Sequence, residues 1–213
     1  MKRILAIAAV CCALVSCSKY TPFLYRIVTM GFTRSDATLL ADDGRVYSFT
    51  EGAKPEWGEG TRVMAIMDVR SELTDSTRLA SMVSWTAPLY KQPVVVTKDP
   101  LPDTLGTDGI AMLDGWYAGG CLNMLNRISV VKGTGTHVVN LLADRRRDSS
   151  DTLYLELRHR SDYTPAENEV ESNYDFYSSF PIKELVRELD SAVLALSWRW
   201  KDTVLTRTAV IKP

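Results

Sequence analysis

The stretch DTLYLELRHR, residues 151–160, decides the fold class because apolar and polar side chains alternate along it. Leu153, Leu155 and Leu157 lie on one face together with His159, while threonine, glutamate and arginine side chains occupy the other. A period of two residues is that of a β-strand with one face packed on a core. The stretch therefore predicts a half-buried strand.

The same alternation recurs in two other segments of the chain. The apolar faces are Val63, Ala65, Met67 and Val69 in residues 62–70, and Leu194, Leu196, Trp198 and Trp200 in residues 193–200. The opposite face of the first segment carries Arg62, Asp68 and Arg70. This repeated pattern predicts an all-β protein.

Turn-forming residues separate the predicted strands. Asp42-Asp43-Gly44 lies between residues 37–40 and 45–49 and predicts a hairpin, because Asp-Gly tolerates the positive φ of such turns. Lys201-Asp202 predicts a final hairpin that leads into residues 204–212. The regular spacing of strands and turns is typical of small barrels and sandwiches.

Glycines and one helical pattern complete this picture. We expect bulges or turns at Gly115, at Gly119-Gly120 and at Gly133-Thr134-Gly135. Residues 181–189 have apolar side chains at helical spacing after Pro181, which predicts a short helix that serves as a crossover.

A proline-containing charged segment, residues 98–103, is the best candidate linker. Pro100 and Pro102 stiffen the chain and remove backbone donors that a sheet would need. The strands before it, in residues 25–97, fit a small OB-like barrel. The strands after it, in residues 104–213, fit an immunoglobulin-like β-sandwich.

The N-terminus has the pattern of a bacterial lipoprotein signal. Lys2 and Arg3 precede an uncharged apolar run over residues 4–15, and Leu14-Val15-Ser16-Cys17 resembles a lipobox. We expect cleavage after residue 16, lipidation of Cys17 and a tether over residues 17–24. Two or three acyl chains, at about 0.8 kcal/mol per buried methylene, hold a protein stably on a membrane. The alternative is an ordinary signal peptide or an inner-membrane stub.

The residues after the anchor bear on localisation. Ser18, rather than Asp, follows Cys17, which by analogy with lipoprotein sorting favours the outer membrane. No acidic run of the kind that marks surface-exposed lipoproteins follows. We therefore expect a lipid-anchored protein that faces the periplasm, with the cell surface as the alternative.

Several motifs together resemble the NigD-like lipoprotein family. They are Thr38-Leu39-Leu40-Ala41-Asp42-Asp43-Gly44-Arg45-Val46-Tyr47, Gly60-Thr61-Arg62-Val63, Asp114-Gly115-Trp116, His137-Val138-Val139-Asn140-Leu141 and Leu153-Tyr154-Leu155-Glu156-Leu157-Arg158-His159. The resemblance implies an N-terminal OB-like domain and a C-terminal β-sandwich. After His159 the sequence departs from the family pattern. The family is associated with bacteriocin-type gene clusters in some Bacteroidetes, and it supplies no catalytic residues.

The sequence contains no pattern of an enzyme or of a nucleic-acid-binding protein. The formal net charge is −1, and nucleic-acid binding normally needs clustered Lys and Arg. The chain has no Gly-x-Ser-x-Gly elbow, and Gly133-x-Gly135 is too short to hold a phosphate. We therefore expect no catalytic residues and no cofactor.

Metal ligands are scarce in the sequence. His137 and His159 are the only histidines, and Cys121 is the only cysteine after the predicted anchor. A zinc site would need all three, so we interpret the histidines as hydrogen-bonded side chains at sheet ends. Cys121 alternates with Asn123 and Leu125, which predicts a small core residue and not a nucleophile.

Three other groups have a structural and a functional interpretation. Glu167, Glu169 and Glu171, flanked by Asp162 and Asp175, predict a solvated acidic loop, with a calcium loop as the alternative. Arg145-Arg146-Arg147 predicts a polar hairpin tip, with an anionic headgroup site as the alternative. Trp116, Trp198 and Trp200 predict sandwich core, with sugar stacking as the alternative.

Three functions follow as hypotheses. The first is a non-catalytic interaction module that binds a protein or an envelope component. The second is an oligosaccharide or peptide binder, which exposure of Trp57 or Trp116 would support. The third is immunity against a bacteriocin, which rests on the family resemblance alone.

Overall fold

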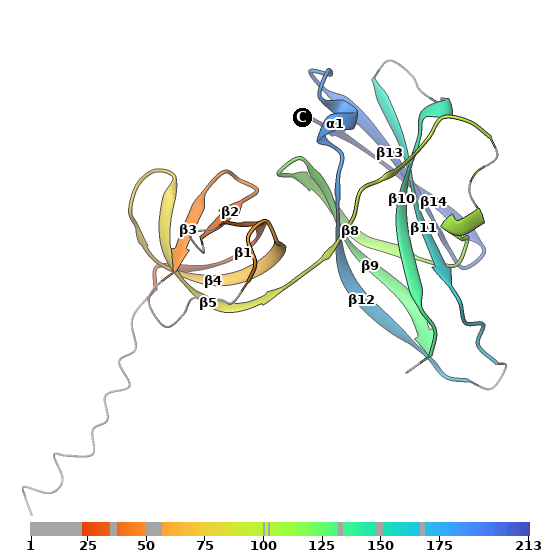
Figure 1. The fold of residues 1–213 in the computed structure, drawn as a ribbon, viewed down its shortest axis with the longest axis horizontal. Coiled ribbons are helices and arrows are strands. Elements are labelled where there is room, and N and C mark those ends of the chain that lie inside the picture. The colour runs from red at the N-terminus through yellow and green to blue at the C-terminus, as the bar shows by residue number, and fades with distance from the viewer. Residues whose placement is uncertain are drawn as a thin grey trace, which may run out of the picture.

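The protein folds into two β-domains that lie side by side (Figure 1). The computed structural model describes residues 23–34, 38–49, 57–99, 101, 103–131, 134–147, 151–166 and 169–213. Among these residues, no helix is long and apolar enough to cross a membrane. The predicted signal peptide, Cys17 and most of the tether lie outside the described residues.

The N-terminal domain is a closed five-stranded barrel, which confirms the OB-like prediction. Its strands are β1 (Tyr25–Thr33), β2 (Leu39–Ala41), β3 (Val46–Phe49), β4 (Arg62–Glu72) and β5 (Thr77–Thr86), in the order β1-β2-β3-β5-β4. Pairing of β1 with β4 closes the barrel. The predicted apolar face of β4, from Val63 to Val69, is fully buried in the barrel together with Leu39 and Tyr47.

The C-terminal domain is a β-sandwich, as predicted. One sheet has the order β14-β13-β11-β10-β7 and the other β6-β12-β9-β8. The strands are β6 (Leu89–Tyr90), β7 (Val94–Val96), β8 (Ala111–Ala118), β9 (Cys121–Val131), β10 (His137–Asp144), β11 (Thr152–Ser161), β12 (Glu171–Pro181), β13 (Ala192–Trp200) and β14 (Thr203–Ile211).

The sandwich core forms from the alternating faces that the sequence predicted. Leu153, Leu155 and Leu157 on β11 are buried, and so are Leu194, Leu196 and Trp198 on the adjacent strand β13. They pack against the inner face of the second sheet, for example against Met124 and Phe180. The predicted final hairpin joins β13 and β14, and Lys201 in its turn has a φ of 53°.

The change from barrel to sandwich occurs earlier than the predicted linker. β6 pairs in parallel with β12, and β7 pairs in parallel with β10, so residues 89–96 already belong to the sandwich. Leu101, from the predicted linker, packs against the small buried cluster of Val96, Leu105 and Leu142. These two strands are too short to produce an alternating pattern, and the prolines therefore suggested the wrong boundary.

The predicted helix over residues 181–189 is shorter than expected. Only α1 (Lys183–Val186) is α-helical, because Pro181 still belongs to β12 and the chain turns at Ile182. The apolar residues of this pattern still pack as expected, because Ile182 and Val186 are buried in the sandwich core. Two short 3₁₀ turns, η1 (Asp103–Leu105) and η2 (Arg145–Arg147), occur elsewhere.

Candidate interdomain binding site

A buried arginine of the barrel, Arg62, makes an ion pair within the barrel and hydrogen bonds to the sandwich. Arg62 at the start of β4 contacts the Asp42 carboxylate through two guanidinium nitrogens, with 2.6 Å between Nη2 and Oδ2. The side chains of Arg62 and Asp42 are 1% and 8% exposed. The Asp-Asp-Gly turn and the Gly-x-Arg-Val segment of the sequence therefore meet at the domain junction.

The same guanidinium bonds to the sandwich. Arg62 Nε donates to Ser179 Oγ at 3.1 Å, and Nη2 donates to Asn123 Oδ1 at 2.9 Å. Ser179 in turn donates to Asn123 Oδ1. The centroid of the Phe32 ring lies 4.7 Å from the guanidinium carbon of Arg62, and the Phe32 ring contacts Tyr90 edge to face. Aromatic rings therefore line the junction. A buried charge with this many partners fixes the geometry of the groups around it.

Close backbone approach makes the junction tight. Gly119, in the turn between β8 and β9, has a φ of 60°, and a Cβ atom at this position would overlap the Asp42 carboxylate. Cys121 is buried beside Arg62 and Ser179, in agreement with the small core residue that the sequence predicted. Burial raises the pKa of the Cys121 thiol, which keeps it protonated and unreactive at neutral pH.

A groove opens next to this junction and receives side chains from both domains. Its cavity volume is about 410 Å³. The barrel wall consists of Val28, Thr29, Met30 and Met64 with the Asp42-Asp43 turn, and the sandwich wall consists of Asp114, Trp116, Ala118, Leu125 and Tyr177. Small-molecule and peptide sites commonly occupy such domain interfaces.

The chemistry of the groove is apolar with an acidic rim. Trp116 and Tyr177 are half-buried, and Met64 supplies an adaptable thioether, so the walls offer flat and flexible contact surface. Asp114 is exposed on one rim, where it pairs with Arg207, and Asp43 is exposed on the other, where it pairs with Arg45. This arrangement suits recognition of a group with a large apolar surface.

The structure brings the two predicted histidines together. His137 Nδ1 and His159 Nε2 lie 3.0 Å apart, and the rings are stacked. His159 Nδ1 contacts the Gly109 carbonyl at 3.0 Å and must donate to it, which leaves its Nε2 as the acceptor for His137. Burial lowers the pKa of His159. The prediction that both histidines are hydrogen-bonded is therefore confirmed.

The acidic loop has no described metal geometry. No group of three or more His, Cys, Asp or Glu side chains converges within the part of the chain that the structure describes. Glu169 accepts hydrogen bonds from Tyr163 and from the Ala166 backbone, and these bonds lower its pKa. Glu167 lies outside the described residues.

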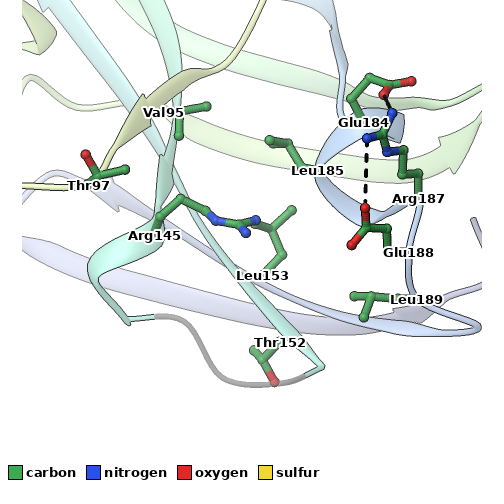
Figure 2. Close-up of a pocket in the computed structure, with 10 residues that line it drawn as sticks. All are labelled: Val95, Thr97, Arg145, Thr152, Leu153, Glu184, Leu185, Arg187, Glu188 and Leu189. Carbon is green, nitrogen blue, oxygen red and sulfur yellow. Dashed lines mark hydrogen bonds and ion pairs between the residues drawn. The ribbon is translucent and has the colours of Figure 1, made fainter.

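The triple-arginine segment forms η2 and borders a hollow of about 400 Å³ (Figure 2). Arg146 pairs with Asp144 and Asp99, and Arg147 stacks on Tyr154 at 4.2 Å. Arg145 extends into the hollow toward Leu153 and Leu185 (Figure 2). Arg187 on the opposite rim is bound by Glu184 and Glu188, so the hollow has no excess of positive charge for an anion.

The predicted tryptophans divide between core and groove. Trp198 is 8% exposed in the sandwich core, and Trp200 packs against the same core. Trp116 instead lines the interdomain groove. Trp57 is half-buried against Phe49 and Trp85 on the barrel. The core interpretation is thus confirmed for two of the three predicted tryptophans, and Trp116 is half-buried.

Comparison with known proteins identifies the family. The NigD-like C-terminal β-sandwich domain matches residues 92–210, so the chain belongs to this family. No curated protein matched the sequence significantly.

Several crystal structures share the fold over nearly the whole chain. A NigD-like immunity protein from Bacteroides caccae is 20% identical, with a TM-score of 0.62 over 91% of this chain and 99% of that one. A candidate lipoprotein from Bacteroides fragilis is 11% identical, with a TM-score of 0.64 over 88% and 98%. A protein of unknown function from Bacteroides vulgatus is 14% identical, with a TM-score of 0.69 over 89% and 91%.

The sequence already contained the two motifs that meet at the junction, but it did not reveal that they meet. The groove had no sequence signal, because its walls come from strands of two separate domains. Of its lining residues, only Trp116 had been considered for binding.

Proposed function

We propose that the protein is a lipid-anchored, non-catalytic recognition protein of the bacterial envelope whose interdomain groove binds a partner protein or an envelope component. The observation that carries the proposal is the apolar groove built from two domains. Hydrogen bonds from the buried Arg62 of the barrel to Ser179 and Asn123 of the sandwich hold the two walls in place. Binding is stronger when the groups of a site are already ordered, because less conformational entropy is lost on binding. A fixed domain junction keeps the groove walls ordered in this way.

The anchor and the compartment are part of the proposal. The lipobox at Leu14-Val15-Ser16-Cys17 and the Bacteroides fragilis neighbour support lipidation of Cys17 after removal of residues 1–16. We place the protein on the outer membrane facing the periplasm, on the strength of Ser18. Mass spectrometry of protein from the native host should reveal diacylglyceryl modification of Cys17, and an unmodified thiol would overturn this part.

The groove is tested by photo-crosslinking in envelopes of the native host, with the crosslinker at Leu125 in the groove. Trp116→Ala should remove the crosslinked partner, because it deletes the largest ring of the sandwich wall. Trp85→Ala is the matched control, since Trp85 is 42% exposed on the barrel and does not line the groove. A partner that is lost equally in both variants, or retained in both, would contradict the proposal.

A second candidate function is immunity against a secreted bacteriocin. The NigD-like immunity protein of Bacteroides caccae supports it, because its fold covers almost the whole chain. Deletion of the gene should increase sensitivity to the bacteriocin of the neighbouring gene cluster, and the wild-type gene should restore resistance. Unchanged sensitivity after deletion would exclude immunity and leave the binding proposal standing.

A further inference from the structure

On one side of the sandwich, strand β12 has an edge that is unpaired over its N-terminal part. On that side, β6 pairs only with Ser178 and Ser179 of β12, and β7 pairs only with residues 142–144 of β10. No described strand pairs with the free edge of β12 over residues 171–176, although β9 pairs along its other edge. We name residues 171–176 the open edge.

The direction of the unused backbone groups follows from a single hydrogen bond. The Ser179 carbonyl accepts from the Lys91 amide, so it points away from β9 and toward β6. In an extended strand the backbone groups of alternate residues point to the same side. Because β12 pairs with β9 in regular register, the amide and carbonyl groups of Asn173 and Asp175 point out of the sheet at the open edge.

A hollow lies directly beside this edge, between the two sheets. Its cavity volume is about 470 Å³, and Ile128, Val139, Tyr174 and Phe176 form its apolar lining. Ile128 and Val139 are buried core residues, whereas Tyr174 is 56% exposed and stacks on Phe176. Inward side chains of an added strand would therefore contact an apolar and aromatic surface.

The opposite face of the open edge is acidic. Glu171 and Asp175 are exposed there, and Asp175 pairs with Arg127 on β9. A second copy of this chain, paired antiparallel about Asn173, would place Glu171 opposite Asp175 and is disfavoured by like charge. Basic side chains at these cross-strand positions would be favoured instead.

The neighbouring edge of β10 is less suitable. Lys91 Nζ donates to Asn140 Oδ1 at 2.6 Å, and this link lies across part of the free stretch of β10. His137 at the start of β10 is already bonded to His159. Of these two described edges, the β12 edge combines free backbone groups, an apolar hollow and a charged outer face.

We propose that a partner protein binds here as an added β-strand along residues 171–176, through an extended segment in which basic residues alternate with large apolar residues. The backbone of the segment would bond to the edge groups of Asn173 and Asp175. Its apolar side chains would enter the hollow beside Tyr174 and Phe176, and its basic side chains would face Glu171 and Asp175. Strand addition of this kind derives affinity from the main chain and specificity from alternate side chains.

The test uses a library of synthetic peptides of about eight residues, a usual strand length, with Lys at alternate positions and Val, Ile, Leu or Phe between them. Fluorescence anisotropy with the full chain should detect binding at concentrations below about 1 mM, the weak end of useful affinities. The best peptide is then made with N-methyl groups on either of the two alternate sets of amides. One set should weaken binding at least about tenfold and the other should change it little, because only one set faces β12.

Protein variants locate the site. Asn173→Pro should abolish binding, since it removes an outward donor at an edge position where proline is tolerated, and Asn173→Ala should retain binding. Asp175→Lys combined with Glu171→Lys should weaken the Lys peptides and favour Glu peptides. Trp116→Ala should have no effect, which separates this site from the interdomain groove.

Three results would overturn the inference. The first is the absence of binding by every library member up to about 1 mM. The second is an equal effect of both N-methyl sets, which needs no altered protein and therefore holds even where a variant fails to fold. The third is unchanged binding to a folded Asn173→Pro protein.

Discussion

The two ends of strand β12 have opposite properties. At its C-terminal end, Ser179 and Phe180 are completely buried, and Ser179 participates in the bonds that join the two domains. Over residues 171–175 every side chain is exposed, and one edge of the strand has no described partner. The closed end contacts Arg62 of β4, whose guanidinium makes four hydrogen bonds to oxygen atoms, and the open end has unused backbone groups.

This difference teaches how one strand can serve both stability and recognition. A buried polar network tolerates little change, because each lost partner leaves another group unsatisfied. An open edge beside a partly filled core tolerates side-chain changes and can still accept a partner. The predictions below test this division, beginning with the closed end.

Removal of the buried cation should have the largest effect. Arg62→Met leaves the Asp42 carboxylate buried without its partner, and we expect a loss of about 3–5 kcal/mol in the free energy of unfolding. Urea denaturation measures it. Arg127→Met is the matched control, because its ion pair with Asp175 is solvent-exposed on the sandwich sheet that Arg62 contacts. The double variant Arg62→Met with Asp42→Leu should recover much of the loss. An additive loss in the double variant would contradict the role of the pair.

The close approach at the junction should have the next largest effect. Gly119→Ala forces a side chain into positive φ, at roughly 1–2 kcal/mol, and it also displaces the Asp42 carboxylate. Gly44→Ala is the control, since Gly44 has a φ of 82° but nothing within 4 Å of a new Cβ atom. Thermal unfolding should rank Gly119→Ala clearly below Gly44→Ala. Equal losses of thermal stability in the two variants would mean that the close contact between residue 119 and Asp42 does not contribute to stability.

The histidine pair should make stability depend on pH. Because burial lowers the pKa of His159 in the folded state, the unfolded chain binds more protons once pH falls below its ordinary value of about 6.5. Stability is therefore fully present above this value and decreases as pH falls toward the folded-state pKa. Urea midpoints at about pH 7.5 and about pH 5.5 should differ in the wild type. His159→Gln should reduce this difference, and an unchanged slope would contradict the assignment.

Changes at the open end should have the smallest effect on stability. Tyr174→Ser removes a ring that is 56% exposed, and we expect a change within about 0.5 kcal/mol. Phe180→Ala on the same strand should be strongly destabilising, because Phe180 is fully buried. Chemical denaturation compares the two. A large loss in Tyr174→Ser would mean that the open side belongs to the core.

Much of the fold followed from local patterns. The alternation in β4, β11 and β13 identified their buried faces, and Asp42-Asp43-Gly44 identified a hairpin. The sequence could not identify β6 and β7, because strands of two or three residues have no period and are defined by their partners. For the same reason the Pro100 segment suggested a domain boundary that the sheet pairing places earlier.

The candidate sites were less accessible to sequence reasoning than the fold. Both histidines were predicted to be hydrogen-bonded, and adjacent strands place them 3.0 Å apart. The groove and the open edge had no comparable signal. Each depends on which strands are neighbours, and Leu125 or Asn173 has the same local sequence whether a partner covers it or not.

The sequence by itself determined the β-strand periodicity, the anchor motif and the family, because these depend on residue order within short segments. Only the tertiary structure decided that Arg62 and Asp42 meet between the domains, that Trp116 faces a groove, and that residues 171–176 have a free edge. The physical reason is that burial and pairing are properties of contacts between distant segments. The residue order of a strand determines which of its faces is apolar, whereas the neighbouring strands determine what that face packs against.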